Sequence, residues 1–226
     1  MFFRADTNQP GTLRFRLFGF PIAIHWSFWV IPILFGAGGG GDPIQQTRFL
    51  LILVAVFFIS ILGHELGHAF AYRKYGGRPN IFIYAMGGMA MVHGHYTRKQ
   101  KIIITIAGPL FGFLMAGICY GILLLPIKWQ SVGNGYLATF LILMSYLNVF
   151  WSFLNLLPIV PLDGGQLLGH IMHEKRPVLR GKIGAFTALI AGIILLQLGY
   201  IFAMIIFGFL AYQNLQAAER AKRGYW

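Results

Sequence analysis

The sequence predicts an all-α polytopic membrane protein of about six transmembrane helices, with a small membrane-associated β-hairpin or sheet. Hydrophobic residues make up 57% of the 226 residues and charged residues only 11%, whereas soluble domains are about a quarter charged. Apolar runs near the length of about 20 residues that a bilayer requires recur along the chain. Basic residues gather in alternate segments between these runs, as expected of a chain that crosses a membrane several times.

The first apolar run covers residues 20–36, and we expect it to be the first span, with Pro32 making it irregular. The segment before it lacks the continuous apolar stretch and the small-residue cleavage site of a signal peptide. The glycine-rich residues 36–41 then predict a flexible loop. The second run begins near residue 49 and continues beyond residue 68, which is long enough for the second span.

Residues 80–93 have the sequence NIFIYAMGGMAMVH, which predicts a strand, a turn at Gly87-Gly88 and a second strand. A hairpin at membrane depth must be buried in protein or line a wet cavity, because lipid cannot satisfy its backbone polar groups. The third and fourth spans are predicted at residues 102–125 and 136–158. Prolines end the fourth span, because their rings cannot continue a helix.

The last apolar run, residues 183–212, has two interpretations. In chain order, the segment before the first span and the segments after the first, second, third and fourth spans hold three, one, six, one and four basic residues. Basic residues gather on the cytoplasmic side, so this alternation places residues 73–101 and 173–182 in the cytoplasm. A basic cytoplasmic tail at 216–226 requires the last run to cross twice, or to enter and return, with a turn at Gly199-Tyr200. One long tilted helix is the alternative, because 30 residues are short for two spans.

The apolar runs fill most of the chain, so we expect one membrane-embedded domain over residues 1–226, without a PDZ or CBS domain. The net charge is +12, which in a soluble protein would favour nucleic-acid binding. Here the basic residues follow the pattern of cytoplasmic loops, so no nucleic-acid partner is expected.

The segment His64-Glu65-Leu-Gly-His68 fits the pattern H-E-x-x-H. On a helix, His64 and His68 share one face, so both imidazoles reach one zinc ion at roughly 2.0–2.1 Å. Glu65 then lies near the metal as a general base. The motif follows an apolar run, where a charged group at the bilayer centre costs on the order of 2–3 kcal/mol, which favours a functional role. The alternative is a pair of interfacial histidines that cap a span.

A catalytic zinc ion usually has three protein ligands, so a third ligand is needed. Asp163 is the candidate among six acidic residues, because it closes the fourth run where unwound backbone lets its carboxylate turn inward. The distribution of basic residues places this end and the H-E-x-x-H motif at the same membrane depth. The alternative is that Asp163 forms a turn or a helix N-cap before Gly164-Gly165.

H-E-L-G-H together with NLLPIVPLDG at residues 155–164 resembles the site-2 protease family of intramembrane zinc metalloproteases (peptidase family M50). That family combines H-E-x-x-H on one helix with N-x-x-P-x-x-x-L-D-G on another. The resemblance covers about residues 22–165, including the Gly-Gly hairpin and Ala107-Gly108-Pro109. It implies a three-helix catalytic core in which His64, His68 and Asp163 bind one catalytic Zn²⁺ and Glu65 is the general base.

The resemblance also places Asn155 near the substrate backbone, where its amide would donate to an oxyanion or hold the unwound substrate. The alternative is an amide that satisfies broken helix backbone. The hairpin at Gly87 and Gly88 would pair with substrate by β-addition, or be purely structural.

The function implied is that of a zinc metalloendopeptidase, which cuts transmembrane protein substrates within or near their helices. We expect a multi-pass protein of the cell membrane with its site towards the cytoplasm, and the lack of room for a PDZ or CBS domain leaves a regulatory membrane partner open. A divalent metal-ion transporter is the alternative, since intramembrane His, Glu and Asp also suit an ion path. No internal repeat supports it.

Overall fold

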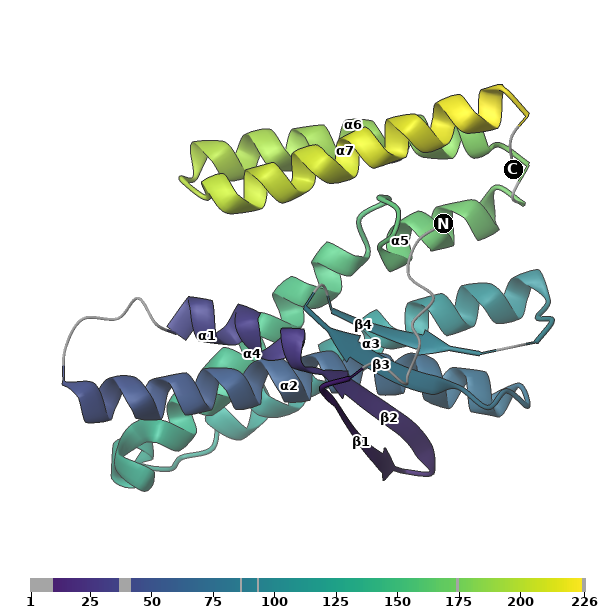
Figure 1. The fold of residues 1–226 in the computed structure, drawn as a ribbon. Coiled ribbons are helices and arrows are strands. Elements are labelled where there is room, and N and C mark those ends of the chain that lie inside the picture. The colour runs from purple at the N-terminus through teal and green to yellow at the C-terminus, as the bar shows by residue number, and fades with distance from the viewer. Residues whose placement is uncertain (1–9, 37–41, 86, 93, 174, 225–226) are drawn as a thin grey trace. The chain divides into compact units, whose positions relative to one another are not determined.

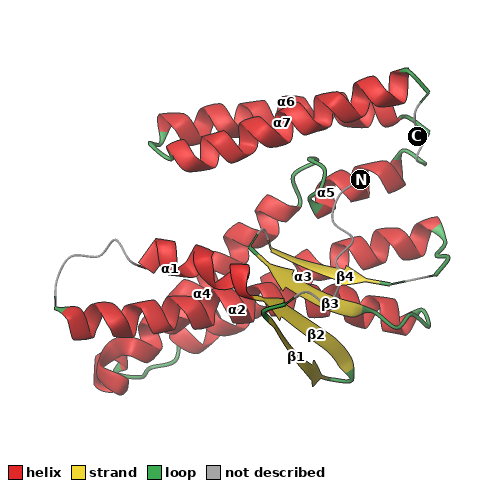
Figure 2. Ribbon diagram, viewed as in Figure 1, coloured by secondary structure: helices red, strands yellow, loops and turns green. Residues whose placement is uncertain are grey.

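The computed structural model describes residues 10–36, 42–85, 87–92, 94–173 and 175–224, and helices dominate them (Figures 1 and 2). The chain divides into two compact units. The first comprises Met1–His95 and Ala107–Ser152, and the second comprises Tyr96–Ile106 and Phe153–Trp226.

The first unit contains one sheet of four strands, in the order β1 (Thr12–Leu17), β2 (Phe20–His25), β3 (Asn80–Tyr84) and β4 (Gly87–Met91). The pairs β1–β2 and β3–β4 are antiparallel, and β2–β3 is parallel. Among the described residues, β4 is therefore an edge strand.

The predicted hairpin is confirmed by β3 and β4, although residue 93 at its predicted end lies outside the described residues, and the turn predicted at Gly87-Gly88 is wrong. Tyr84 pairs with Gly87, so residues 85 and 86 connect the two strands. Both glycines belong to β4, where Gly88 pairs with Ile83. Glycine adds no packing surface to a strand, and in such a position it often marks a close approach by another group.

The prediction of a first span at residues 20–36 is wrong. This segment forms β2, the 3-10 helix η1 (Trp26–Trp29) and the seven-residue helix α1 (Val30–Gly36). The turn between β2 and η1 is fixed by His25, whose Nδ1 accepts a hydrogen bond from the Ser27 amide at 3.3 Å. The apolar residues of the segment serve a sheet, and α1 is too short to cross a bilayer.

Helix α2 (Pro43–Lys74) has 32 residues and carries the H-E-x-x-H motif. It begins at an N-cap, Asp42, whose carboxylate accepts from the Gln45 amide at 3.3 Å. It ends before Gly76, which has a φ of 81°, the left-handed conformation that commonly ends helices. The boundaries of the helix therefore follow from the sequence on both sides of the apolar run.

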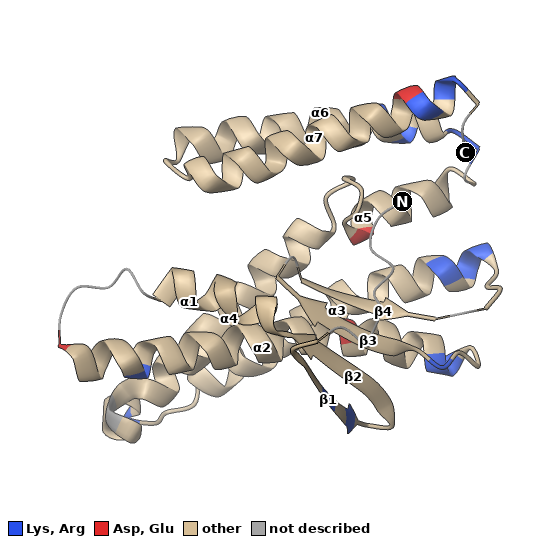
Figure 3. Cartoon of the chain, in the orientation of Figure 1, with Lys and Arg blue, Asp and Glu red and all other residues tan. Residues whose placement is uncertain are grey.

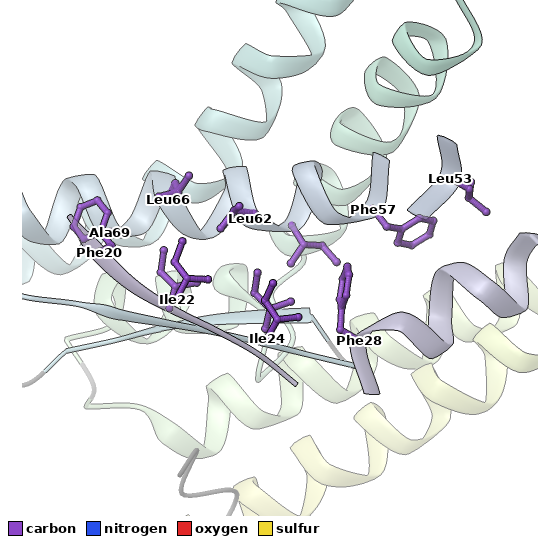
Figure 4. Packing of buried hydrophobic residues seen from close by; sticks show 12 residues of the cluster. Phe20, Ile22, Ile24, Phe28, Leu53, Phe57, Leu62, Leu66 and Ala69 are labelled. Atoms are coloured by element: carbon purple, nitrogen blue, oxygen red, sulfur yellow. The ribbon is translucent and has the colours of Figure 1, made fainter. Parts of the chain in front are cut away.

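A single core cluster joins the sheet to α2, as Figure 4 shows. Alternate residues of β2 and β3 face one side of α2, in agreement with the two-residue period of a strand. The buried members are Phe20, Ile22, Ile24, Phe28, Leu53, Phe57, Ile61, Leu62, Leu66, Ala69, Ile81 and Ile83. Full burial of a Leu, Ile or Phe side chain contributes about 1.5–3 kcal/mol to the stability of the fold. The cluster therefore fixes the sheet firmly against the motif helix.

Helices α3 (Arg98–Leu123) and α4 (Tyr136–Asn155) agree with the third and fourth predicted spans. Two short 3-10 helices, η2 (Trp129–Ser131) and η3 (Gly133–Gly135), lie between them. A buried amide connects α4 to α2, because Asn148 Nδ2 donates to Ser60 Oγ at 2.9 Å.

The second unit contains α5 (Asp163–Ile171), α6 (Pro177–Gln197) and α7 (Ile201–Lys222). The last apolar run is divided between α6 and α7, so the interpretation as one long helix is wrong. The predicted turn is confirmed at Gly199, which has a φ of 83°. Two helices fit because α6 begins before the apolar run and α7 ends after it.

Five helices among the described residues, namely α2, α3, α4, α6 and α7, are long and apolar enough to cross a membrane, and Trp26–Gly36 is a shorter apolar helical segment. Figure 3 shows basic residues at helix ends, with long stretches of helix that carry no charge. Arg73 and Lys74 end α2, and Arg220 and Lys222 end α7. The predicted polytopic all-α class with a small sheet is confirmed.

Candidate active site

His64 and His68 lie one turn apart on α2, with exposed fractions of 3% and 7%. Their Nε2 atoms are 3.2 Å apart. Two ligands at roughly 2.0–2.1 Å from one tetrahedral ion are separated by about 3.3 Å, so this pair fits zinc.

Gly108 of α3 makes room for the imidazole of His68. A Cβ atom at position 108 would lie 2.5 Å from Cε1 and 2.8 Å from Cδ2 of that ring. Gly67 of α2 similarly allows the main chain of α3 to approach, since its Cβ would lie 2.5 Å from the Ala107 carbonyl oxygen. Small residues permit such close packing between membrane helices.

Glu65 is 5% exposed and lies against β4. A Cβ atom at Gly88 would lie 2.6 Å from Oε1 of Glu65, so the main chain of the edge strand packs directly on the carboxylate. Gly87 lies close to α4, since its Cβ would be 3.5 Å from Cζ2 of Trp151. The sheet therefore brings its edge strand, β4, to the predicted general base.

The negative charge of Glu65 also affects Tyr84, the last residue of β3. Burial first, and the negative charge of Glu65 second, raise the pKa of the Tyr84 phenol above its ordinary value of 10.0. The phenol therefore stays protonated through the neutral range. Neither Tyr84 nor the packing role of Gly108 is evident from the sequence, because a strand tyrosine and a helix glycine carry no motif.

In the second unit, Asn155 is the last residue of α4 and Asp163 is the first residue of α5, and each is 9% exposed. The N-cap of α5 is Leu162, so the interpretation of Asp163 as an N-cap is wrong. Gly165 packs on the preceding loop, since a Cβ atom there would lie 2.6 Å from the Ile159 carbonyl oxygen. The Gly-Gly pair thus lets the chain fold back tightly beside the aspartate.

Within the first unit, the structure brings together the three motif residues His64, Glu65 and His68 with Gly88. The second unit holds Asn155 and Asp163 on either side of one short loop. These features define a class: polytopic membrane proteins that carry the H-E-x-x-H motif of metallopeptidases on a membrane helix.

The chain belongs to peptidase family M50, whose family model matches residues 52–129 and 126–198. It is 31% identical over 195 residues to a zinc metalloprotease of Methanocaldococcus jannaschii, covering 85% of this chain and 55% of that protein. It is 29% identical over 159 residues to the stage IV sporulation protein FB of Bacillus subtilis, covering 69% of this chain and 49% of that protein. The chain thus spans about half the length of these relatives.

The fold is similar to that of the site-2 protease from Methanocaldococcus jannaschii, with a TM-score of 0.60 and 27% sequence identity. The similarity covers 92% of this chain and 94% of that chain. The family suggested by the two motifs is confirmed.

Proposed function

We propose that this chain is an intramembrane zinc metalloprotease, which hydrolyses peptide bonds within or near the transmembrane helices of membrane-protein substrates. The observation that carries the proposal is the pair of buried imidazole nitrogens 3.2 Å apart on α2. Membership of family M50 and the zinc metalloprotease named among its relatives support the same chemistry. None of the relatives described above is named as a transporter.

We assign His64, His68 and Asp163 as the ligands of one catalytic Zn²⁺. The three buried residues offer two imidazole nitrogens and one carboxylate oxygen, a donor set typical of zinc hydrolases. A bound zinc ion supplies Lewis acidity, which activates water as a nucleophile and polarises a carbonyl oxygen. Three protein ligands leave one position open for that chemistry.

Glu65 is assigned as the general base and then the general acid. Its carboxylate accepts the proton of the attacking water and returns it to the leaving amine nitrogen, so the proton count is restored when the peptide bond breaks. Burial of Glu65 excludes competing solvent, and the absence of a side chain at Gly88 leaves the carboxylate room beside β4.

We assign the edge strand β4 at Gly87 and Gly88 to substrate binding. A transmembrane substrate hides its carbonyls inside its own helix, so it must unwind before cleavage. An unwound segment satisfies its main chain by pairing with a free strand edge. In this assignment the side-chain amide of Asn155 donates to the substrate carbonyl or to the oxyanion that develops from it.

We further propose that residues 1–226 act as one membrane-embedded metalloprotease domain in the cell membrane, with the site towards the cytoplasm and 216–226 as a basic cytoplasmic tail. The alternation of basic residues along the chain supports this orientation. Its partners in this proposal are the lipid bilayer and transmembrane protein substrates.

The test compares the wild type with Glu65→Gln in zinc content and in cleavage of a panel of single-span substrates. The amide keeps the size of the side chain and removes the base, so zinc stays at about one ion per chain while cleavage falls by at least about 10²-fold. Glu219→Gln, a change to an exposed carboxylate on α7, should alter neither quantity. Zinc-dependent metal flux across vesicles without cleavage would instead establish the transporter.

A further inference from the structure

Asn214 of α7 is a fully buried amide, with an exposed fraction of 1%. Its Oδ1 accepts a hydrogen bond from the Val160 amide at 3.1 Å. Its Nδ2 donates to the Val160 carbonyl at 2.7 Å and to the Leu210 carbonyl at 2.8 Å. One side chain therefore satisfies both main-chain polar groups of Val160, as a neighbouring strand would do in a sheet.

The surroundings hold this amide in place. A Cβ atom at Gly184 of α6 would lie 2.9 Å from Cγ of Asn214 and 3.1 Å from the Pro158 carbonyl oxygen. Ile159 has no exposed surface and packs with Ala188 of α6 and Phe207 of α7. The hairpin of α6 and α7 thus contacts the loop between α4 and α5 at two adjacent residues. It packs against Ile159 and forms hydrogen bonds with Val160.

No other side chain of this size performs the same task. Leucine is at least as large as asparagine but leaves the Val160 amide and carbonyl without their partner, and a buried polar group without a partner is destabilising. An ionised aspartate has acceptors only, so it satisfies the amide and not the two carbonyls. The chemistry therefore selects an amide at position 214.

We propose that Asn214 is a positioning residue for the Asp163 carboxylate, an inference that rests on the zinc protease function proposed above. Val160 lies three residues before Asp163, and Gly165 packs back on Ile159, so the clamped loop leads directly into the ligand. Groups that orient metal ligands typically change metal affinity or activity by about 10- to 100-fold when removed. The hairpin of α6 and α7 is then the scaffold for the third metal ligand.

The test uses Asn214→Leu and, because that variant can fail to fold, Asn214→Asp as a milder change. Gln216→Leu is the matched control, since Gln216 lies on the same helix and its amide donates to the Tyr212 hydroxyl at 2.5 Å. Leu141→Ala, which removes apolar packing from a buried cluster that does not contain Ile159, controls for a loss of stability alone. The measurements are Val160 amide hydrogen exchange without metal, zinc affinity, and the absorption spectrum of the Co²⁺-substituted protein.

We expect Asn214→Leu to accelerate Val160 exchange, weaken zinc binding by about tenfold and alter the Co²⁺ spectrum. Asn214→Asp should change each in the same direction by less, while both controls keep wild-type zinc affinity and spectrum. Unchanged zinc affinity and spectrum in both Asn214 variants would overturn the inference while leaving the protease assignment intact. Failure of the wild type to bind zinc would instead overturn the proposed function, and the exchange measurement would still test the clamp.

A second observation concerns a cavity of about 630 Å³ in the first unit, beside the end of α2. Arg16, Arg73 and Arg78 line it, and no acidic residue is among its described lining. Arg73 is held rigidly, because its Nη1 donates to the Phe18 carbonyl at 2.8 Å and its guanidinium lies 4.6 Å from the ring centroid of Phe20. The cavity is therefore lined by three basic side chains, of which Arg73 is positioned by these contacts.

We infer that this cavity binds the phosphate group of an anionic membrane lipid. Helix α2 is long and apolar enough to span the membrane and ends at Lys74, so we expect the cavity beside this end to face the lipid headgroups. Each basic residue near an anionic surface contributes about 1 kcal/mol, which corresponds to about fivefold in lipid affinity.

The test counts phosphatidylglycerol that stays bound to the protein by native mass spectrometry. The double variant Arg16→Gln/Arg78→Gln is compared with Arg220→Gln/Lys222→Gln, which removes the same charge from the end of α7. Loss of bound lipid from the first variant alone supports the site, and equal loss from both overturns it. Displacement of the lipid by inorganic phosphate as readily as by glycerol phosphate would show a free-anion site and also overturn the lipid assignment.

Discussion

The packing of Gly108 against His68 makes the substitution Gly108→Ala a sensitive probe of the proposed zinc site. The added methyl group would lie 2.5 Å from Cε1 of the imidazole. Ordinary carbon contacts are about 3.5–4.0 Å, so the ring has to move by about 1 Å. The His68 ring can move because it belongs to a side chain and not to the main chain. We therefore expect a small loss of folding stability, but a displaced imidazole that no longer fits the proposed zinc site.

A displacement of about 1 Å in a catalytic group can lower the rate by about 10²-fold. We therefore expect Gly108→Ala to weaken zinc binding and to lower kcat/KM by about that factor. Zinc content, zinc affinity and cleavage of a single-span substrate measure the effect, with thermal unfolding in detergent as the measure of stability.

Gly117→Ala is the matched control on the same helix, because a Cβ atom there meets nothing within 4 Å. Alanine is a better helix former than glycine by about 1 kcal/mol, so this control should be at least as stable as the wild type. Gly67→Ala gives the contrasting case, since its methyl group would lie 2.5 Å from the main-chain oxygen of Ala107 and forces two helices apart. Wild-type zinc affinity and activity in Gly108→Ala would refute the reasoning.

Three further predictions follow from contacts in the first unit. Gly88→Ala places a methyl group 2.6 Å from Oε1 of Glu65, so cleavage should fall by about 10- to 100-fold while zinc content, measured in parallel, stays unchanged. The raised pKa of Tyr84 means that the unfolded chain loses its phenol proton first, so stability is retained below pH 10.0 and falls above it; Tyr84→Phe should reduce this alkaline loss in unfolding measurements at increasing pH. Asn148→Leu removes the donor to Ser60 Oγ and should lower the free energy of unfolding by about 1–3 kcal/mol, with zinc affinity in the folded protein unchanged.

The sequence was most informative where one physical constraint dominated. The spans of α2, α3 and α4 follow from long apolar runs, and His64, Glu65 and His68 follow from their spacing on one helix. Asp163 could be selected because the chain has only six acidic residues. Each of these features can be recognised in the sequence without knowledge of the tertiary contacts.

The errors arose where the same local signal serves two structures. The apolar residues 20–36 read as a span, but β2 is a buried strand, and periodicity alone does not separate short buried strands from helices. The pair Gly87-Gly88 has the composition of a turn, but it lies in β4, where Gly88 allows the close approach of Glu65. The role of Asn214 could not be predicted from the sequence, because it depends on hydrogen bonds to Val160, which lies 54 residues away along the chain.

The position of His64 along α2 determines how far water must travel to the proposed site and how far products must travel to leave it. His64 lies about 15 Å along the helix axis from the basic end at Lys74, and about twice that distance from Pro43. The proposed hydrolysis would consume one water molecule per peptide bond, so the supply of water and the release of the polar new chain ends would favour the shorter route, towards Lys74. We expect the two halves of a cut substrate to part in opposite directions, with one released towards the basic end of α2 and the other retained in the lipid.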